Sequence, residues 1–202
     1  MGQDLWIFEK RALAKGFSKI AGIDEAGRGP LAGPVVSAAV ILPVSFPISE
    51  ITDSKKLSPK KREVLYHKIY DHAVSIGIGI VDSLEIDRIN ILQASLLSMV
   101  ISVENLSPQP DCLLIDGKFP ISHDLPQETI PKGDLLSISI GAASIIAKVT
   151  RDRLMERYHQ DYPEFDFLRH KGYPTKAHKA AICKFGCCLI HRRSFKGVKE
   201  FV

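Results

Sequence analysis

Residues 20–34 read Ile20-Ala-Gly-Ile-Asp-Glu-Ala-Gly-Arg-Gly-Pro-Leu-Ala-Gly-Pro34, an apolar run that ends in two carboxylates and continues into glycines around an arginine. Asp24 and Glu25 can supply hard oxygen ligands to a divalent cation. The turn from Gly27 to Gly29 offers backbone N–H groups and one guanidinium to a phosphodiester. Carboxylates and phosphate-binding groups this close together indicate metal-assisted cutting of nucleic acid.

Two apolar runs on either side of this turn suit β-strands. Residues 20–23 lead into the acid pair, and residues 35–42 form a β-branched run bounded by prolines, which is typical of a strand buried on both faces. We therefore expect Asp24 and Glu25 at a strand end. Neighbouring residues of a strand face opposite sides, so the two acids share a site only if the strand breaks there. The glycines that follow permit such a break.

The rest of the chain alternates between helical and extended patterns. They predict a helix over 4–15, a helix from Ser58 and Pro59 to about Asp71, a strand over 73–81, a helical region over 82–104 with a break near Asn90, a strand over 112–115, a long helix over 137–159 and a short helix from Thr175 to about Lys184. The fold class is therefore α/β. Without repeats or linkers, we expect one domain over 1–202.

Composition excludes few functions. With 45% hydrophobic and 25% charged residues, the 202-residue chain reads as an ordinary globular protein. A net charge of +4 permits an anionic partner without demonstrating one. A secretory signal is not evident, and no apolar run reaches the ~18 residues of a membrane helix, so we expect a cytoplasmic protein with no membrane contact.

Four cysteines are present, without the paired C-x-x-C spacing of a common zinc site. Disulfides are not expected in the cytoplasm. Reduced, structural thiols are the favoured interpretation, although a zinc site can be assembled on paper from His178, Cys183, Cys187 and His191.

Further carboxylates come from two other places in the sequence. Asp116 follows the run 112–115, and Asp134 ends Pro131-Lys-Gly-Asp134. Taken singly, each acid suits a turn or a solvated strand end. Gathered at one point, carboxylates raise each other's proton affinity unless divalent cations neutralise them. Two Mg²⁺ or Mn²⁺ ions ~3.5–4 Å apart would do so, and would promote an in-line displacement at phosphorus.

Other segments suit contact with nucleic acid, each with a plainer alternative. Lys55 and Lys56, in Asp53-Ser-Lys-Lys-Leu57, could bind phosphate or form a solvated turn. Tyr173, in Lys171-Gly-Tyr-Pro-Thr175, could stack on a sugar or base, or pack against a helix. Basic runs at 148–153 and 191–195 could follow a phosphate backbone, but most such runs are solvated faces.

Taken in order, seven motifs closely resemble those of bacterial ribonuclease HII and span nearly the whole chain. They are Gly22-Ile-Asp-Glu-Ala-Gly-Arg-Gly-Pro-Leu-Ala-Gly-Pro34, Asp53-Ser-Lys-Lys-Leu57, Ile115-Asp-Gly117, Lys132-Gly-Asp134, Ala142-Ala-Ser-Ile-Ile-Ala-Lys-Val-Thr-Arg-Asp152, Lys171-Gly-Tyr-Pro-Thr175 and His191-Arg-Arg-Ser-Phe195.

The resemblance implies an RNase H-like fold, a mixed central sheet flanked by helices with a helical C-terminal part over about 160–202. It implies cutting of the RNA strand of RNA–DNA hybrids and of single ribonucleotides embedded in duplex DNA, on the 5′ side, leaving a 3′-hydroxyl and a 5′-phosphate. Two divalent ions, Mn²⁺ or Mg²⁺, would be the cofactors, and a monomer is expected.

The same resemblance assigns roles to residues. The four acids Asp24, Glu25, Asp116 and Asp134 would bind the ions, with Asp24 bridging them. The backbone and the 2′-hydroxyl at the RNA–DNA junction would be gripped by Gly27, Arg28 and Gly29. Tyr173 would stack on the following deoxyribose.

Two departures leave the C-terminal substrate contacts open, namely residues 117–120 and the short tail ending at Val202. One alternative is a ribonuclease HIII-like hybrid nuclease, which has an extra N-terminal domain and a glutamate as its fourth acid. Here only about twenty residues precede the first motif, and the fourth acid is Asp134. The other alternative is a non-catalytic nucleic-acid-binding protein, which would bind without needing Mg²⁺ or Mn²⁺.

Overall fold

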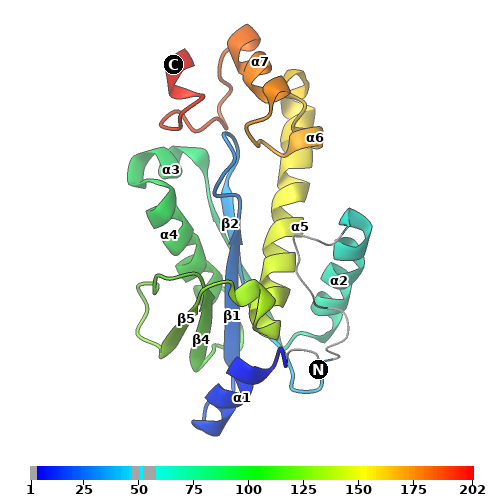
Figure 1. Cartoon of the computed structure of the whole chain (residues 1–202), viewed down its shortest axis with the longest axis vertical. Coiled ribbons are helices and arrows are strands. Elements are labelled where there is room, and N and C mark those ends of the chain that lie inside the picture. The colour runs from blue at the N-terminus through cyan, green and yellow to red at the C-terminus, as the bar shows by residue number, and fades with distance from the viewer. Residues whose placement is uncertain (1–3, 47–50, 52–57) are drawn as a thin grey trace.

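A mixed β-sheet lies at the centre of the molecule (Figure 1). The computed structural model describes residues 4–46, 51 and 58–202, so Lys55 and Lys56 lie outside the described residues. Within the described part the sheet has five strands in the order β3-β2-β1-β4-β5. β2 pairs antiparallel with both β1 and β3, whereas β1, β4 and β5 run parallel. The strands are β1 (Ile20–Ala26), β2 (Val35–Ile41), β3 (Ser75–Val81), β4 (Cys112–Asp116) and β5 (Gln127–Ile130).

Helices cover both faces of this sheet. α5 packs along β1 and β2 on one face with α2 against it, and α4 packs against β2 and β3 on the other. Every residue of β2 is buried, as predicted for a strand covered on both sides. The helices of the sheet layer are α1 (Ile7–Ala14), α2 (Pro59–His72), α3 (Ser83–Ile89), α4 (Ile91–Glu104) and α5 (Ile138–Asp161). The mixed sheet between helices confirms the predicted fold class.

Several predicted boundaries are confirmed by capping contacts. Ser58 accepts a hydrogen bond from the Lys61 N–H at the start of α2, with Pro59 in the first turn. Asn90, at a φ of 68°, separates α3 from α4 and caps α4 with its side chain. β5 was not predicted, because only one of its four residues is buried and its polar side chains give no apolar alternation.

One predicted boundary is wrong. β1 does not end at Ile23 but continues to Ala26, because its antiparallel pairing with β2 extends through Asp24, Glu25 and Ala26. Pairing with β4 stops earlier, at Ile23 opposite Ile115. The chain leaves the strand at Gly27, whose φ of 101° favours glycine.

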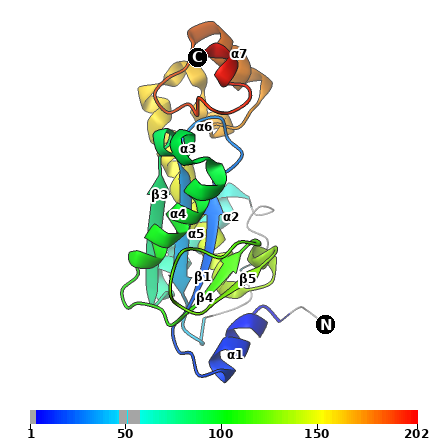
Figure 2. The same cartoon turned by 90° about the vertical axis from the view of Figure 1, so that its left-hand side faces the viewer.

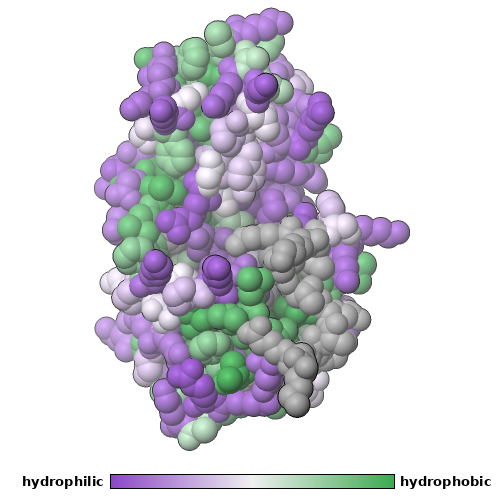
Figure 3. Space-filling view, viewed as in Figure 1, coloured by the Kyte–Doolittle hydropathy of each residue, from purple (hydrophilic) through white to green (hydrophobic). Residues whose placement is uncertain are grey.

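The C-terminal part lies beyond the end of the sheet, against the far end of α5 (Figure 2). It contains the short helices η3 (Pro163–Phe165), α6 (Phe167–His170), α7 (Lys176–Phe185) and η4 (Lys199–Phe201). Their apolar side chains form a small cluster with Leu31, Ala32 and Met155 of α5. Hydrophilic residues dominate its surface in the view of Figure 3. Among the helices of the described residues, none has the length and apolar character needed to cross a membrane.

Candidate active site

The register of the parallel strands places two of the predicted acids side by side. Ile23 of β1 lies opposite Ile115 of β4, and Asp24 and Asp116 each come one residue later. Neighbouring strands are about 4.8 Å apart. The two carboxylates therefore meet at the carboxyl end of the parallel pair, where α/β sheets build their sites.

Asp24 is a buried carboxylate that the protein satisfies only in part. Its residue is 2% exposed, and one oxygen, Oδ1, accepts the Glu25 N–H at 2.7 Å. The other oxygen, Oδ2, is buried and accepts no hydrogen bond from the described residues. Burial raises the pKa of Asp24 well above its usual value, and the charges of Glu25 and Asp116 raise it further, while Ser144 opposes them. An orphaned carboxylate oxygen beside two more acids fits a divalent cation.

Asp134 reaches the same end of the sheet through β5. After Ile130 the chain turns into the 3₁₀-helix η2 (Gly133–Leu135), and the Gly133 N–H donates to Asp116 Oδ1 at 2.6 Å. The next residue is Asp134, which is buried at 7% exposure. This hydrogen bond attaches η2 to the end of β4. Asp134 therefore directly follows Gly133, the residue that donates to Asp116.

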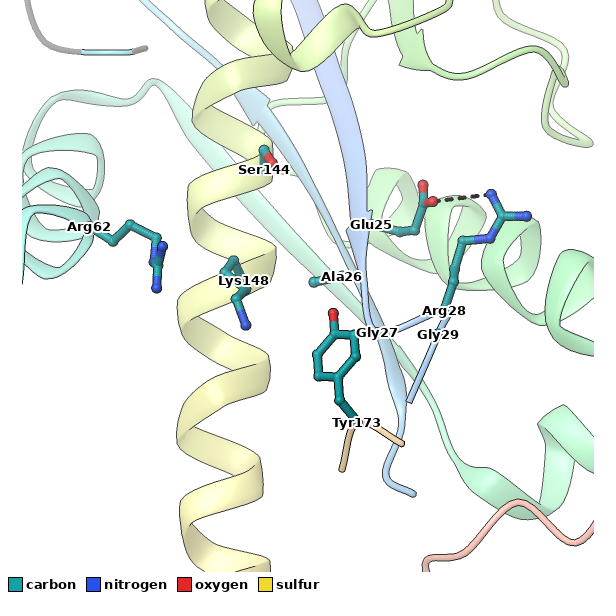
Figure 4. A pocket seen from close by; sticks show the side chains of 9 residues that line it. All are labelled: Glu25, Ala26, Gly27, Arg28, Gly29, Arg62, Ser144, Lys148 and Tyr173. Atoms are coloured by element: carbon teal, nitrogen blue, oxygen red, sulfur yellow. Dashed lines mark hydrogen bonds and ion pairs between the residues drawn. The ribbon is translucent and has the colours of Figure 1, made fainter. Parts of the chain in front are cut away.

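Glu25 occupies the opposite side of the strand from the α5 side chains. Figure 4 shows its carboxylate turned away from Ser144 and Lys148 and paired with Arg28, and the two are 3.3 Å apart (Nη1 to Oε1). In the described part of the chain, no group of three or more His, Cys, Asp or Glu side chains could hold a metal ion as it stands. Acids that repel one another do not converge without a compensating charge. Because β1 stays extended through Glu25, the side chains of Asp24 and Glu25 do not face one site in this structure. The assignment of the four acids as metal ligands stays a prediction.

A pocket of about 410 Å³ opens beside this strand end. Positive and neutral donors dominate its wall, since the lining includes one carboxylate and three basic side chains. Figure 4 shows Lys148 and Ser144 on α5, Arg62 on α2 and the Tyr173 ring around it. The lining residues are Glu25, Ala26, Gly27, Arg28, Gly29, Arg62, Ser144, Lys148 and Tyr173. The predicted turn and the predicted aromatic ring therefore share one pocket with a predicted acid.

Tyr173 is held next to the glycine turn. A Cβ on Gly29 would lie 3.7 Å from Tyr173 Cε1, and the Leu31 N–H donates to the Gly172 carbonyl at 2.8 Å. The ring is 42% exposed. Because the ring lies over the turn and remains open to solvent, it can stack on a ligand that the turn binds.

Three buried histidines support the same segment. His178 Nδ1 donates to the Tyr173 carbonyl at 3.0 Å, which leaves its Nε2 to accept from His191 Nε2 at 3.1 Å. His191 Nδ1 then accepts the Cys188 N–H at 3.0 Å. The rings of His170 and His178 stack with centroids 4.4 Å apart. These contacts engage the imidazoles of His178 and His191, and the four cysteines form no disulfide in this structure.

Sequence reasoning missed several pocket residues. Ser144 and Lys148 were quoted only as part of a motif, although their spacing of four places them on one face of a helix. Lys148 pairs with Asp152 at 2.6 Å. Arg62, on α2, carried no signal, because only packing of α2 against α5 brings it to the pocket.

Comparison with known proteins shows the family of the chain. The family model described as Ribonuclease HII matches residues 21–198. The chain belongs to the ribonuclease HII family. It is 58% identical to ribonuclease HII of Syntrophus aciditrophicus over 94% of this chain and 89% of that protein. It is 56% identical to ribonuclease HII of Geobacter sulfurreducens over 97% of this chain and 90% of that protein. As a member of this family it is a metal-dependent endonuclease with ribonuclease H activity.

Solved structures of ribonuclease HII relatives share its fold. The ribonuclease H2 of Pyrococcus horikoshii superposes with a TM-score of 0.77 at 28% identity, over 91% of this chain and 97% of that one. The ribonuclease HII in a PCNA complex from Archaeoglobus fulgidus gives 0.72 at 26% identity, over 89% and 96%. Bst-RNase HIII in complex with Mn²⁺ gives 0.69 at 19% identity and matches over only 68% of its length. That last likeness concerns the fold alone.

Proposed function

We propose that this ribonuclease cuts the RNA strand of RNA–DNA hybrids and also single ribonucleotides embedded in duplex DNA. Cleavage falls on the 5′ side of the ribonucleotide and leaves a 3′-hydroxyl and a 5′-phosphate. The observation that carries the proposal is the pocket in which the glycine turn, Tyr173 and Glu25 meet beside the buried carboxylate of Asp24. One wall offers donors to a nucleic-acid backbone, and the adjoining strand end offers acids.

Two divalent ions, Mn²⁺ or Mg²⁺, are the proposed cofactors, and Asp24, Glu25, Asp116 and Asp134 would hold them. Bound there, the pair would activate a water and stabilise the leaving oxygen. Asp24 would suit a position shared by both ions, because its Oδ2 is buried without a hydrogen bond from the described residues and the charges of Glu25 and Asp116 both act on it. A cation that binds Glu25 would also compete with Arg28 for its carboxylate and leave the guanidinium to a phosphate.

The residues of the pocket divide the remaining work. Lys148 and Arg62 place positive charge opposite the turn, where a phosphodiester would lie. Arg28 and Gly29 present N–H groups that can contact a 2′-hydroxyl without reading the base. Tyr173 would stack on the deoxyribose that follows. We propose a monomer of one domain that acts in the cytoplasm.

The residues of this site do not favour the ribonuclease HIII-like alternative. The fourth acid is Asp134, and the family model that matches is that of ribonuclease HII. A purely binding role is set aside by membership of an enzyme family.

The proposal is tested by incubating the protein with a duplex that contains one ribonucleotide, with and without Mn²⁺. Cutting 5′ to the ribonucleotide only when the ion is present is the expected result. An all-DNA duplex of the same sequence is the control and should stay intact. Equal binding and no cutting in both conditions would contradict the proposal.

A further inference from the structure

Two arginines are fully buried next to the pocket and sit among backbone carbonyls. Arg151 of α5 and Arg192 of the C-terminal segment are each 0% exposed. A buried charge is costly unless hydrogen bonds satisfy it. Both guanidiniums donate to carbonyl oxygens of the loop over residues 27–34, which begins with the glycine turn.

Arg192 makes the more extensive set of contacts. Its Nη2 donates to the Gly27 carbonyl at 2.6 Å, and its Nη1 donates to the Arg28 carbonyl at 3.0 Å. The same Nη1 reaches the Pro30 carbonyl at 2.9 Å, and Nε reaches the Gly33 carbonyl at 2.9 Å. One guanidinium thus fixes four peptide groups along seven residues of the loop. None of these acceptors is a carboxylate.

The chain on either side of this arginine is itself anchored. The Arg192 N–H donates to the Leu31 carbonyl at 2.9 Å. Asp87 of α3 accepts the N–H groups of Arg193 and Ser194 at 2.7 and 2.9 Å. The guanidinium is therefore a fixed part of the structure, held between α3 and the loop.

The orientation of a peptide carbonyl determines where the next N–H points. In a trans peptide the C=O and the N–H lie in one plane and point in opposite directions. Because the carbonyls of Gly27 and Arg28 point at the buried guanidinium, the N–H groups of Arg28 and Gly29 point away from it. Both residues are exposed and line the pocket, and neither N–H donates to another described residue.

The geometry points to Arg192 as the positioning residue of the substrate-binding turn: it orients the Arg28 and Gly29 N–H groups toward a ribonucleotide in the pocket. This role rests on the proposed function. A lysine cannot replace it, because an ammonium is a point donor and cannot reach four carbonyls in the plane of a guanidinium.

Arg151 performs a different task and provides a comparison. It donates to the carbonyls of Ala32 and Pro34 at 3.1 and 3.0 Å, and to the Lys171 carbonyl at 3.1 Å. None of these carbonyls belongs to the peptides that carry the Arg28 and Gly29 N–H groups. Arg151 thus ties the loop to the turn before Tyr173, whereas Arg192 orients the donors.

Steady-state cleavage of a duplex with one ribonucleotide, in Mn²⁺, tests this role in Arg192→Lys. Contacts made equally in the ground and transition states act on KM, so KM should rise by roughly 10- to 100-fold with a much smaller change in kcat. Ile182→Ala is the matched control. Ile182 is 0% exposed in the apolar cluster of the C-terminal part and is given no part in substrate binding. Its loss of stability should lower the active fraction and leave KM unchanged.

Each outcome decides a separate point. Failure of the wild-type protein to cut this duplex at all would overturn the proposed function. Normal cutting with an unchanged KM in folded Arg192→Lys would overturn only the role of Arg192. If that variant does not fold, amide NMR of the wild-type protein in Ca²⁺ decides. The Arg28 and Gly29 resonances should shift more with the ribonucleotide duplex than with all-DNA duplex, and equal shifts would overturn the inference.

Discussion

The end of β1 and the turn that follows it each contain a buried charged group, but only the charged group at the turn has its hydrogen bonds satisfied by the protein. The Asp24 carboxylate is buried with one oxygen unsatisfied and with two further acids beside it. Three residues later the loop rests on the Arg192 guanidinium, which is equally buried but donates to four carbonyls. The fold therefore supplies hydrogen-bond acceptors to the buried Arg192 guanidinium. It leaves one oxygen of the buried Asp24 carboxylate without a hydrogen-bond donor from the described residues. Under the proposed function, this contrast would hold the substrate-binding turn rigid and make the acids depend on added cations.

The largest expected effect comes from removing the unsatisfied anion. Loss of a residue that only hydrogen-bonds to a metal ligand costs roughly 10–100-fold in activity. Asp24→Asn alters a proposed ligand itself, so it should lower the cleavage rate by more than that. The same change should raise the Tm of the metal-free protein, because it removes a buried charge held against two others. Activity assays and thermal unfolding in EDTA measure the two effects.

Asp111→Asn is the matched control for that stability gain. The Asp111 carboxylate accepts hydrogen bonds from Ser18 and from the Lys19 N–H, so its pKa is lowered. Neutralising it should lower the Tm and leave cleavage intact. A metal-free Asp24→Asn protein that melts below the wild type would refute the contrast between the two charges.

The next effect concerns the rigid turn. A Cβ on Gly27 would lie 2.1 Å from Arg151 Nε and 2.8 Å from the Pro34 carbonyl, and the φ of 101° disfavours any side chain. Gly27→Ala should cost more than the ~1–3 kcal/mol of an unfavourable backbone conformation and should impair cleavage. Urea unfolding measures the loss.

Gly16→Ala is the control that separates the cost of the backbone conformation from the cost of the steric clash at Gly27. Gly16 has a similar φ of 94°, and an added Cβ would meet nothing within 4 Å. It should show the backbone cost alone and normal activity. Equal losses of stability in the two variants would show that the Arg151 side chain and the Pro34 carbonyl move aside and do not confine the turn at Gly27.

A smaller effect is expected at the aromatic ring beside the turn. Tyr173→Ala should weaken cutting at a single embedded ribonucleotide by about 10-fold, the order of one stacking contact, and weaken cutting of a long hybrid less. Tyr70→Ala, at the same 42% exposure on α2, should change neither rate. Equal losses on both substrates would count against a role at the junction.

The smallest effect is a pH dependence of stability. Burial lowers the pKa of His178 and of His191 to about 4, below the ordinary 6.5. Between pH 6.5 and pH 4 the two histidines are protonated in the unfolded chain but neutral in the folded chain. The free energy of unfolding should therefore fall as the pH falls from about 6.5 toward about 4. The Tm should drop by at least about 2–4 °C, the effect of ~1 kcal/mol in a domain of this size.

Variants assign that slope to the histidine network. His178→Gln should flatten it relative to the wild type. His67→Gln, which removes an exposed imidazole on α2, should not. A slope that is unchanged in His178→Gln would show that the network is not the origin of the acid sensitivity.

The sequence alone predicted the buried strands and most helix starts, because apolar alternation and capping residues such as Ser58 and Thr175 are local signals. It also marked the acids and the glycine turn. It could not give the register that sets Asp24 beside Asp116, since pairing depends on chain segments far apart. The strand expected to end at Ile23 was too short for the same reason, because pairing with β2 keeps the chain extended to Ala26.

The buried arginines show the limit most clearly. Arg151 and Arg192 belong to basic runs that are most often solvated faces, yet each is fully buried. Every residue has a backbone carbonyl. The sequence therefore gives no sign of which carbonyls will surround a buried guanidinium. Only the folded loop shows which positive charge holds the turn and which faces solvent.

Anomalous scattering at the manganese edge, from crystals soaked in Mn²⁺ with an uncleavable ribonucleotide duplex, would locate the ions at the four acids. We expect two peaks about 3.5–4 Å apart, within ligand distance of Asp24, Glu25, Asp116 and Asp134. Peaks at other residues, or no peak at the end of β1, would contradict this assignment of the acids.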